Sequence, residues 1–208
     1  MSQADDVRLP GWKQLLARPR GDLGAPNDLD VRDLAHFYVD AFGRRALLDH
    51  VRTRLGVQRA PGALHHALAR VPAAVNLTTN FDRLLGRAME EARGVPPSVI
   101  ILDCDVGLID EAQQTTVVKH HGCLSMPQEI VPTREDFAAY ADRHRALLAY
   151  PQALLAARIF LFIGFSLTDP NFRAVDFAIR QALGAYRRTA YALGARPKPA
   201  HETRHWQE

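Results

Sequence analysis

The sequence predicts an α/β fold with a mainly parallel sheet and a helical module. Three observations support this prediction. Apolar residues recur at helical spacing, with charges between them, through the first third of the chain. Short strand-like runs then alternate with helical segments, the pattern of a parallel α/β layer. Finally, "IFLFIGF" (159–165) is an uninterrupted apolar run, typical of a strand buried on both faces.

The individual elements follow from the same patterns. Helical segments keep apolar residues three or four positions apart, and prolines bound the shortest of them. The expected helical segments are 28–56 (two helices), 61–72, 81–92, 133–158 with an interruption at Pro151, and 170–184. The expected strands are 73–79, 97–103, 115–121, 159–165 and 189–193.

These elements predict one domain over residues 1–208. Its expected parts are a helical module (28–72), a sheet core (73–125 and 156–193), a helical insert (133–157) and a loose, proline-containing tail (194–208). With 208 residues, 47% of them hydrophobic, the chain can bury a sizeable core.

Charge and cysteine usage bound the function. The 26 basic and 23 acidic residues are well mixed and leave a net charge of +3, which does not favour nucleic-acid binding. No apolar run approaches the roughly 18 residues of a membrane span, and no signal peptide is evident. Cys104 and Cys123, the only cysteines, fit a reducing cytoplasm and exclude a four-cysteine zinc site.

Polar and glycine residues gather at the ends of three expected strands. The segments are "TTNFD" (78–82), "KHHG" (119–122) and "GFSLTDPN" (164–171). In open parallel sheets, ligands bind beyond the carboxyl ends of the strands. Three such ends from separate parts of the chain therefore predict one shared site.

Each cluster also has a purely structural interpretation. Asn80 or Thr79 is a possible N-cap of the helix expected from Phe81, with Asp82 in its first turn. Asp169 followed by Pro170 fits an N-cap and a first helical position, and Gly164 fits a tight turn. These alternatives remain open at the level of sequence.

The adjacent histidines can be separated. Neighbouring side chains on a strand point to opposite faces, so His120 and His121 cannot bind one metal ion without distortion. Cys123 is close in sequence, but no further ligand follows at zinc-like spacing. We expect one histidine to pack into the sheet layer and His121, next to Gly122, to reach the crevice. A neutral imidazole there can accept a proton near physiological pH.

Taken in order, "TTNFDRLL", "KHHGCL", "TREDF" and "FLFIGFSLTDPNF" resemble the sirtuin-like domain of prokaryotic defence proteins. The resemblance runs from about Leu9 to Leu193. The sirtuin signature T-Q-N-I-D corresponds to residues 78–82, with threonine in place of glutamine. The catalytic H-G pair corresponds to His121 and Gly122, and the nucleotide-contacting G-x-S to Gly164 and Ser166.

This resemblance implies a Rossmann-like, mainly parallel sheet with helices on both faces, which binds NAD. It also implies hydrolysis of NAD to nicotinamide and ADP-ribose during antiphage defence in the cytoplasm, with a defence-system protein as a possible partner and no membrane partner. The implied catalytic residues are His121, Asn80 and Asp82. The implied NAD-contacting residues are Thr78, Thr79, Gly122, Gly164, Phe165 and Ser166.

Two departures from the sirtuin pattern qualify what the resemblance implies. Sirtuin deacylases carry a structural zinc on four cysteines, and fewer residues separate their signature asparagine from their catalytic histidine than separate Asn80 from His121 here. Deacylation is therefore the less favoured activity, and no zinc is expected. The family also opens with a strand and a G-A-G-x-S loop that holds the NAD phosphates. This sequence contains no G-x-G, and "RLPGWKQLL" (8–16) resembles the segment after that loop. Either the natural start lies upstream, or the chain is a non-catalytic module that binds NAD, ADP-ribose or a protein.

Overall fold

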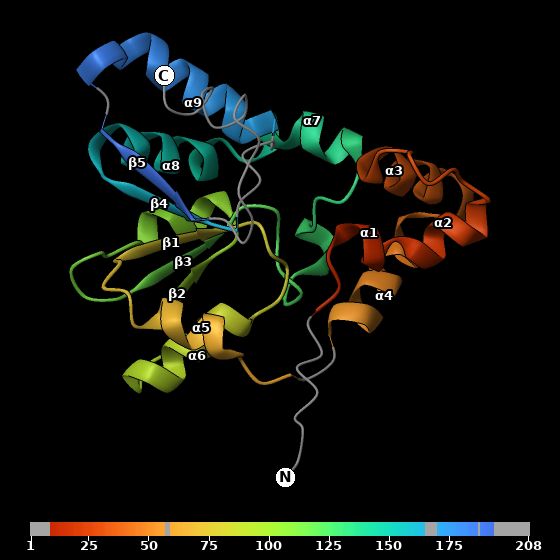
Figure 1. Ribbon diagram of the computed structural model, residues 1–208, viewed down its shortest axis with the longest axis horizontal. Helices are drawn as coiled ribbons and strands as arrows, with labels where there is room; N and C mark the ends of the chain where they lie inside the picture. Colours follow the sequence, from red (N-terminus) through yellow and green to blue (C-terminus); the bar gives the residue numbers. More distant parts are fainter. Residues whose placement is uncertain (1–8, 57–58, 165–169, 187, 194–208) are drawn as a thin grey trace. The chain divides into compact units, whose positions relative to one another are not determined.

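The computed structural model describes residues 9–56, 59–164, 170–186 and 188–193. The chain divides into two compact units, Met1–Leu147 and Leu148–Glu208, which are described separately. The α/β class and the parallel strand arrangement are confirmed (Figure 1). The finer division into a helical module, a sheet core and an insert stays a prediction. Among the described helices, none combines the length and the apolar character needed to cross a membrane.

Four helices open the first unit. They are α1 (Trp12–Leu15), α2 (Ala17–Leu23), α3 (Val31–Phe42) and α4 (Arg44–Leu55). The two helices expected over 28–56 are thus confirmed as α3 and α4. The Asp30 carboxylate accepts a hydrogen bond from the Arg32 amide at 2.9 Å, which caps the first turn of α3. Gly43 separates the helices at a φ of 83°, a value that favours glycine.

The apolar faces of these helices form the larger core of the unit. Its buried members are Leu15, Leu16, Leu34, Ala35, Tyr38, Leu47, Val51, Phe81 and Ile130. Two of them come from segments far from the four helices in sequence: Phe81 follows the first strand, and Ile130 precedes α7 (Arg134–Arg143). The ring of Phe81 meets that of Trp12 edge-to-face, with centroids 5.4 Å apart. The helical core therefore fixes the loop that contains the expected site residues.

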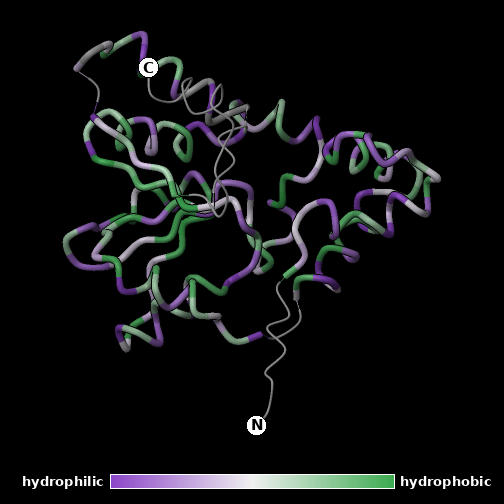
Figure 2. Tube along the Cα trace, viewed as in Figure 1, coloured by the Kyte–Doolittle hydropathy of each residue, from purple (hydrophilic) through white to green (hydrophobic). Residues whose placement is uncertain are grey.

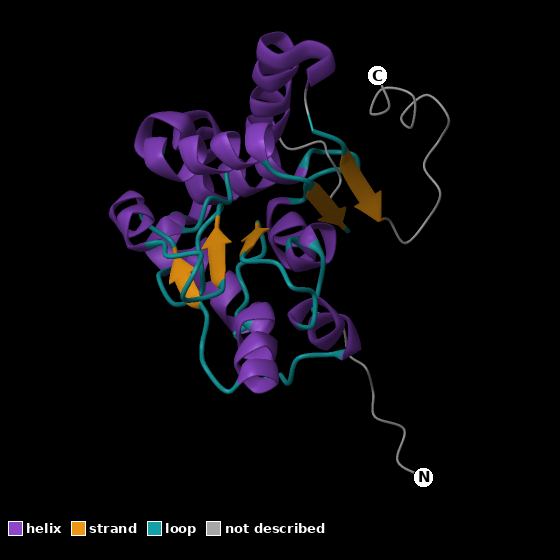
Figure 3. Ribbon diagram, turned by 90° about the vertical axis from the view of Figure 1, so that its left-hand side faces the viewer, coloured by secondary structure: helices purple, strands orange, loops and turns teal. Residues whose placement is uncertain are grey.

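A three-stranded parallel sheet forms the other layer of this unit (Figures 1 and 3). Its strands are β1 (Val75–Thr78), β2 (Ser98–Ile100) and β3 (Thr116–Lys119), in the order β1-β3-β2. The register pairs Thr78 with Lys119, so β1 and β3 end together. β3 is central, and all four of its residues are buried, with the apolar Val117 and Val118 between the polar Thr116 and Lys119 (Figure 2 colours the chain by hydropathy).

Helices α5 (Ala63–Ala69) and α6 (Leu84–Arg93) pack against each other beside the sheet. A small buried core joins Ala69 of α5, Ala88 and Met89 of α6, and Val117 of β3. The side chain of Arg93, in the last turn of α6, donates to the carbonyl groups of Ala69 and Val71, both at 3.3 Å. One face of the sheet is therefore covered by these two helices.

The predicted interruption at Pro151 is wrong. The helices are α7 (Arg134–Arg143) and α8 (Arg145–Ala157), so the break falls at His144 and Pro151 lies inside α8. The carboxylate of Asp103, in the 3₁₀ segment Asp103–Leu108, accepts hydrogen bonds from Ala146 N at 3.0 Å and Leu147 N at 3.1 Å. A residue distant in sequence thus caps the start of α8, which periodicity along the chain does not reveal.

An ion pair connects α7 to the helical core. Arg44 Nη1 donates to both carboxylate oxygens of Asp136 at 2.9 and 2.8 Å, and Arg44 Nη2 donates to the carbonyl oxygen of Ile130 at 2.8 Å. Asp136 also forms a capping box with Thr133, whose hydroxyl donates to it at 2.8 Å. The capping box and the ion pair share one buried carboxylate.

The second unit holds β4 (Phe160–Ile163), β5 (Ala190–Leu193), α9 (Pro170–Leu183) and the 3₁₀ turn Gly184–Tyr186. β4 and β5 pair in parallel, Phe160 opposite Ala190, and the expected strands and helix are confirmed. The expected burial of β4 on both faces is wrong, because Leu161 is 52% exposed. An apolar run permits burial of a strand on both faces, but each face is buried only where other elements cover it.

Replacing Asp136 with alanine should destabilise the fold. The variant loses the capping box and the bidentate partner of Arg44, whose side chain is itself partly exposed. We expect a loss of about 1–3 kcal/mol in the free energy of unfolding, measured by urea denaturation. Asp142→Ala, at an exposed position of the same helix, is the matched control and should change stability little. Equal effects of the two substitutions would contradict this role of Asp136.

Candidate functional site

Two loops that follow the paired strands β1 and β3 lie side by side. The amide of His120 donates to the carbonyl oxygen of Thr78 at 3.0 Å, which extends the β1–β3 ladder by one bond. Further along, the amide of Leu124 donates to the carbonyl oxygen of Phe81 at 2.9 Å. The structure thus brings the segments "TTNFD" and "KHHG" together at one edge of the sheet, at the carboxyl ends of the strands.

Lys119, which no motif in the sequence indicated, connects the two loops. Its ammonium group donates to the carbonyl oxygen of Asn80 at 2.9 Å and also to that of Asp82. Lys119 is only 4% exposed, and burial lowers the pKa of its amine, although Cys123 and Asp82 nearby act in the opposite direction. A lysine that ends a buried apolar strand was the clue available in the sequence.

The "TTNFD" loop presents its polar groups in different ways. The amide of Asn80 donates to the hydroxyl oxygen of Thr78 at 3.1 Å, and the Asn80 side chain is exposed. The Asp82 carboxylate accepts from the amide of Leu84 at 2.9 Å. The N-cap role considered for Asn80 or Thr79 is wrong, because α6 begins at Leu84 and its N-cap residue is Arg83. Asp82 precedes the first helical turn and satisfies one of its amides.

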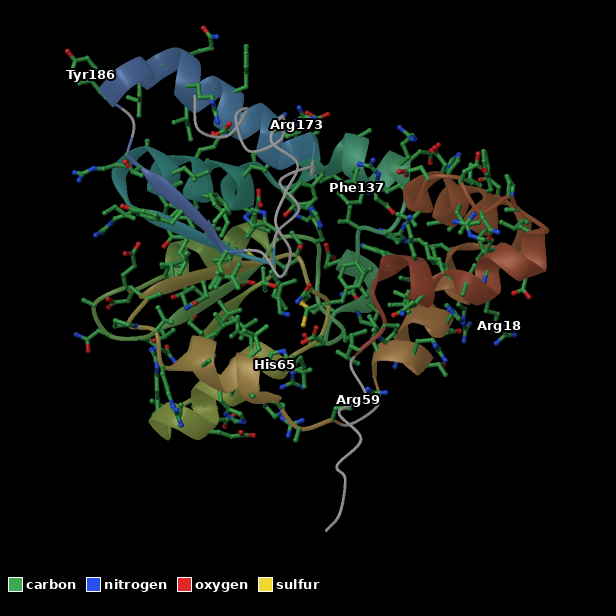
Figure 4. All side chains as sticks on the ribbon, in the orientation of Figure 1. Arg18, Arg59, His65, Phe137, Arg173 and Tyr186 are labelled. Atoms are coloured by element: carbon green, nitrogen blue, oxygen red, sulfur yellow. The ribbon has the colours of Figure 1, made fainter. Side chains whose placement is uncertain are left out.

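The expectation that the two histidines point to opposite faces of a strand is wrong. β3 ends at Lys119, so both histidines lie in the following turn, where the alternation of a strand no longer applies. Nδ1 of His120 lies 3.2 Å from the Tyr140 hydroxyl. The His121 ring meets the rings of Phe137 and Tyr140 edge-to-face, at centroid distances of 4.7 and 5.7 Å (Phe137 is labelled in Figure 4). Both imidazoles therefore face α7.

The two imidazoles differ in how deeply they are buried. His121 is 7% exposed, while His120 is half-buried. Desolvation, followed by the charges of His121 and His144, lowers the pKa of His120 from 6.5 to about 4. His120 is therefore neutral at physiological pH. The Tyr140 ring lies between these groups, with the His144 ring 4.6 Å from it.

Gly122 is required by the close approach of another backbone segment. Its φ is 90°, and a Cβ atom at this position would lie 2.8 Å from Cα of Ile130 and closer still to the carbonyl group of Glu129. The amide of Val131 donates to the carbonyl oxygen of His121 at 3.1 Å in the same contact. The turn that holds His121 is thus clamped against the segment before α7, and only glycine fits there.

The carboxyl group of Asp82 and the imidazole of His121 have different neighbours. Asp82 lines a cavity of about 990 Å³ together with residues of α4 and α6. His121 instead packs on the aromatic residues of α7. The two loops therefore meet through their backbones, while these two side chains extend into separate surroundings.

The third predicted cluster falls in the second unit. Gly164 follows β4 with a φ of 62°, and its amide donates to the carbonyl oxygen of Leu193 at 3.0 Å. This conformation agrees with its interpretation as a turn glycine. Phe165, Ser166 and Asp169 lie outside the described residues, while Pro170 is the first residue of α9. The NAD-binding roles of Gly164, Phe165 and Ser166 stay predictions.

Among the described residues, no group of three or more histidine, cysteine, aspartate or glutamate side chains is placed to hold a metal ion. Cys104 is exposed and Cys123 is buried, and both are free thiols.

Comparison with known proteins gives the family. Residues 74–208 match the family described as the SIR2-like domain. The chain belongs to this SIR2-like family. The match begins one residue before β1 and includes both loops of the candidate site.

This SIR2-like chain is also similar to curated proteins named NAD(+) hydrolase ThsA. It is 31% identical to the protein of Bacillus cereus (strain MSX-D12) over 185 residues, 85% of this chain and 37% of the relative. It is 30% identical to that of Enterococcus faecium over 189 residues, 88% of this chain and 39% of the relative. For Acinetobacter baumannii (strain 532279) the identity is 27% over 186 residues, 88% of this chain and 38% of the relative. The chain thus spans well under half the length of these relatives.

Substituting Gly122 with alanine should distort the turn after β3. The positive φ and the collision with the carbonyl group of Glu129 together predict a loss of at least about 2 kcal/mol in the free energy of unfolding. Gly107→Ala is the matched control, because a Cβ there meets nothing within 4 Å. Chemical denaturation of both variants measures the difference, and a stable Gly122→Ala protein would refute the clamp.

The low pKa of His120 predicts a pH-dependent stability. Its pKa is depressed in the folded protein, so the unfolded chain binds the proton more readily. The contribution of neutral His120 to the free energy of unfolding is complete above pH 6.5 and decreases as the pH falls toward about 4. At pH 5 the loss should be about 2 kcal/mol.

His120→Asn tests this assignment, because the amide oxygen can still face the Tyr140 hydroxyl but does not titrate. The difference in unfolding free energy between the parent and this variant should shift in favour of the variant as the pH falls from 7 to 5. A difference that stays constant with pH would contradict the assignment of the acid sensitivity to His120.

Proposed function

We propose that this SIR2-like chain hydrolyses NAD to nicotinamide and ADP-ribose, as part of a prokaryotic antiphage defence system. The observation that carries the proposal is the hydrogen-bonded convergence of the "TTNFD" and "KHHG" loops at the carboxyl ends of β1 and β3. The similarity to relatives named NAD(+) hydrolase ThsA supports the same activity. A defence-system protein partner and a cytoplasmic location belong to this proposal.

The reaction breaks the bond between the nicotinamide nitrogen and the ribose carbon. The bonding electrons leave with nicotinamide, which departs as a neutral base, and the ribose passes through an oxocarbenium-like state. The oxygen of a water molecule then bonds to the ribose carbon, and the water loses one proton. The site must therefore position the ribose, stabilise its positive charge and accept that proton.

In this mechanism His121 is the general base, acting on the water or on a ribose hydroxyl. Its ring is nearly enclosed by Phe137 and Tyr140, which restricts the orientation of the imidazole. The clamp at Gly122 fixes the backbone beside it. A base with so little freedom needs little reorganisation when the substrate is bound.

Asn80 and Asp82 act from the neighbouring loop. The exposed Asn80 side chain would position the ribose or the water by hydrogen bonding. The carboxylate of Asp82 would orient that group or support the developing positive charge. Lys119 holds the backbone carbonyl groups of both residues and therefore acts as a positioning residue.

The remaining contacts to NAD are proposed for two sets of residues. Thr78, Thr79 and Gly122 belong to the converging loops of the first unit. Gly164, Phe165 and Ser166 correspond to the nucleotide-contacting segment of sirtuins; a glycine there lets the backbone approach the nucleotide, and the serine offers a hydroxyl.

The purified chain, incubated with NAD, should release nicotinamide and ADP-ribose in equal amounts. His121→Phe keeps an aromatic ring in the buried position but removes the base, so we expect the rate to fall roughly 100-fold or more. Asn80→Ala, at an exposed position, should lower the rate without loss of fold. Chromatographic quantification of both products measures these effects.

Phe137→Leu is the matched control for His121→Phe, since it removes a ring contact of His121 but retains the imidazole. It should lower the rate far less than His121→Phe does, because the base remains. An active His121→Phe enzyme would exclude His121 as the base. A folded chain that binds NAD without releasing nicotinamide would contradict hydrolysis and favour a binding module.

A further inference from the structure

A large cavity of the first unit is rich in arginine, and none of these arginines has a role in the proposed reaction. It measures about 990 Å³, within the range of small-molecule sites. Three parts of the chain contribute its arginines: the end of α4, the segment before α5, and the start of α6. These arginines are Arg52, Arg59, Arg83 and Arg87. The label in Figure 4 marks Arg59 on the segment between α4 and α5.

The lining also holds the carboxylates of Asp49, Asp82 and Glu90, so four arginines face three acidic side chains. Arg87 lies 4.0 Å from the carboxylate of Glu91. Asp49 pairs with Arg45 at 3.7 Å, outside the cavity lining, and Asp82 accepts from the amide of Leu84. Within the described part of the chain, neither Arg52 nor Arg83 has an ion-pair partner. Both guanidinium groups are exposed to solvent and can reorient toward a ligand.

Two further features make the cavity favourable for an anion. The first turn of α6, with Leu84 in the lining, brings the positive end of a helix dipole. The hydroxyl group of Ser125 adds a neutral donor, while that of Thr53 donates to the carbonyl oxygen of Asp49 at 2.8 Å.

We propose that this cavity binds a phosphate-bearing anion. Guanidinium groups match the geometry of phosphate oxygens and bind them through paired hydrogen bonds. The anion comes either from the phosphates of a dinucleotide at the neighbouring site or from a separate small phosphate ligand. Both sources would present phosphate oxygens to the same arginines.

Inorganic pyrophosphate is the first probe, with binding to the 208-residue chain measured by isothermal titration calorimetry. The double variant Arg52→Gln/Arg83→Gln should bind it at least about 10-fold more weakly. Affinity of the parent should also fall as sodium chloride is raised. Both substitutions are at exposed positions, and circular dichroism verifies that the variant is folded.

Arg18→Gln/Arg54→Gln is the matched control. It removes the same charge at a second cavity of about 680 Å³, which both residues line. Pyrophosphate affinity should be unchanged in this control. Failure of the parent to bind pyrophosphate would overturn the proposal, and so would equal weakening, or no weakening, in both double variants. Binding of pyrophosphate does not require NAD hydrolysis, so the two proposals fail independently.

Competition with ADP-ribose then distinguishes the sources. Displacement of pyrophosphate by ADP-ribose assigns the cavity to the phosphates of the dinucleotide. In that case the Arg52→Gln/Arg83→Gln enzyme should show a raised KM for NAD with little change in kcat. Simultaneous binding of both molecules assigns the cavity to a separate phosphate ligand. Either result supports a phosphate site formed by these arginines.

Discussion

The ammonium group of Lys119 is the constraint on which the candidate site depends. Lys119 is the last residue of the central strand β3, and its ammonium group donates to the carbonyl oxygens of Asn80 and Asp82. It therefore joins β3, which leads into the "KHHG" loop, to the backbone of the "TTNFD" loop. A buried amine needs such partners, because an unpaired charge or donor in the interior is costly. The requirement to satisfy Lys119 therefore determines the path of the "TTNFD" loop.

The same loop is fixed from its other side by hydrophobic packing. Phe81 lies between two residues of the proposed site and is buried in the helical core, against Trp12. Ile130 enters the same core just after the segment that approaches Gly122, and its carbonyl oxygen accepts from Arg44. The helical layer thus supports both loops of the candidate site at the edge of the three-stranded sheet.

Much of the architecture was predictable because it depends on local pattern. The helices α3 and α4, the five strands and α9 all lie within the expected segments. The prediction failed where a distant group decided the outcome. Asp103 caps α8 and places the helix break at His144, and the end of β3 at Lys119 leaves both histidines in a turn facing α7. Neither effect is encoded in the spacing of nearby residues.

The sequence by itself determined the α/β class, the parallel strands and the polar loops at their ends, since periodicity and turn chemistry act over a few neighbouring residues. Only the tertiary structure decided which side chains surround these loops. Lys119 donates hydrogen bonds to two carbonyl groups, burial lowers the pKa of His120 to about 4, and arginines from three segments line one cavity. Each of these properties arises from burial and from contacts between residues far apart in the chain, and such contacts exist only once the chain is folded.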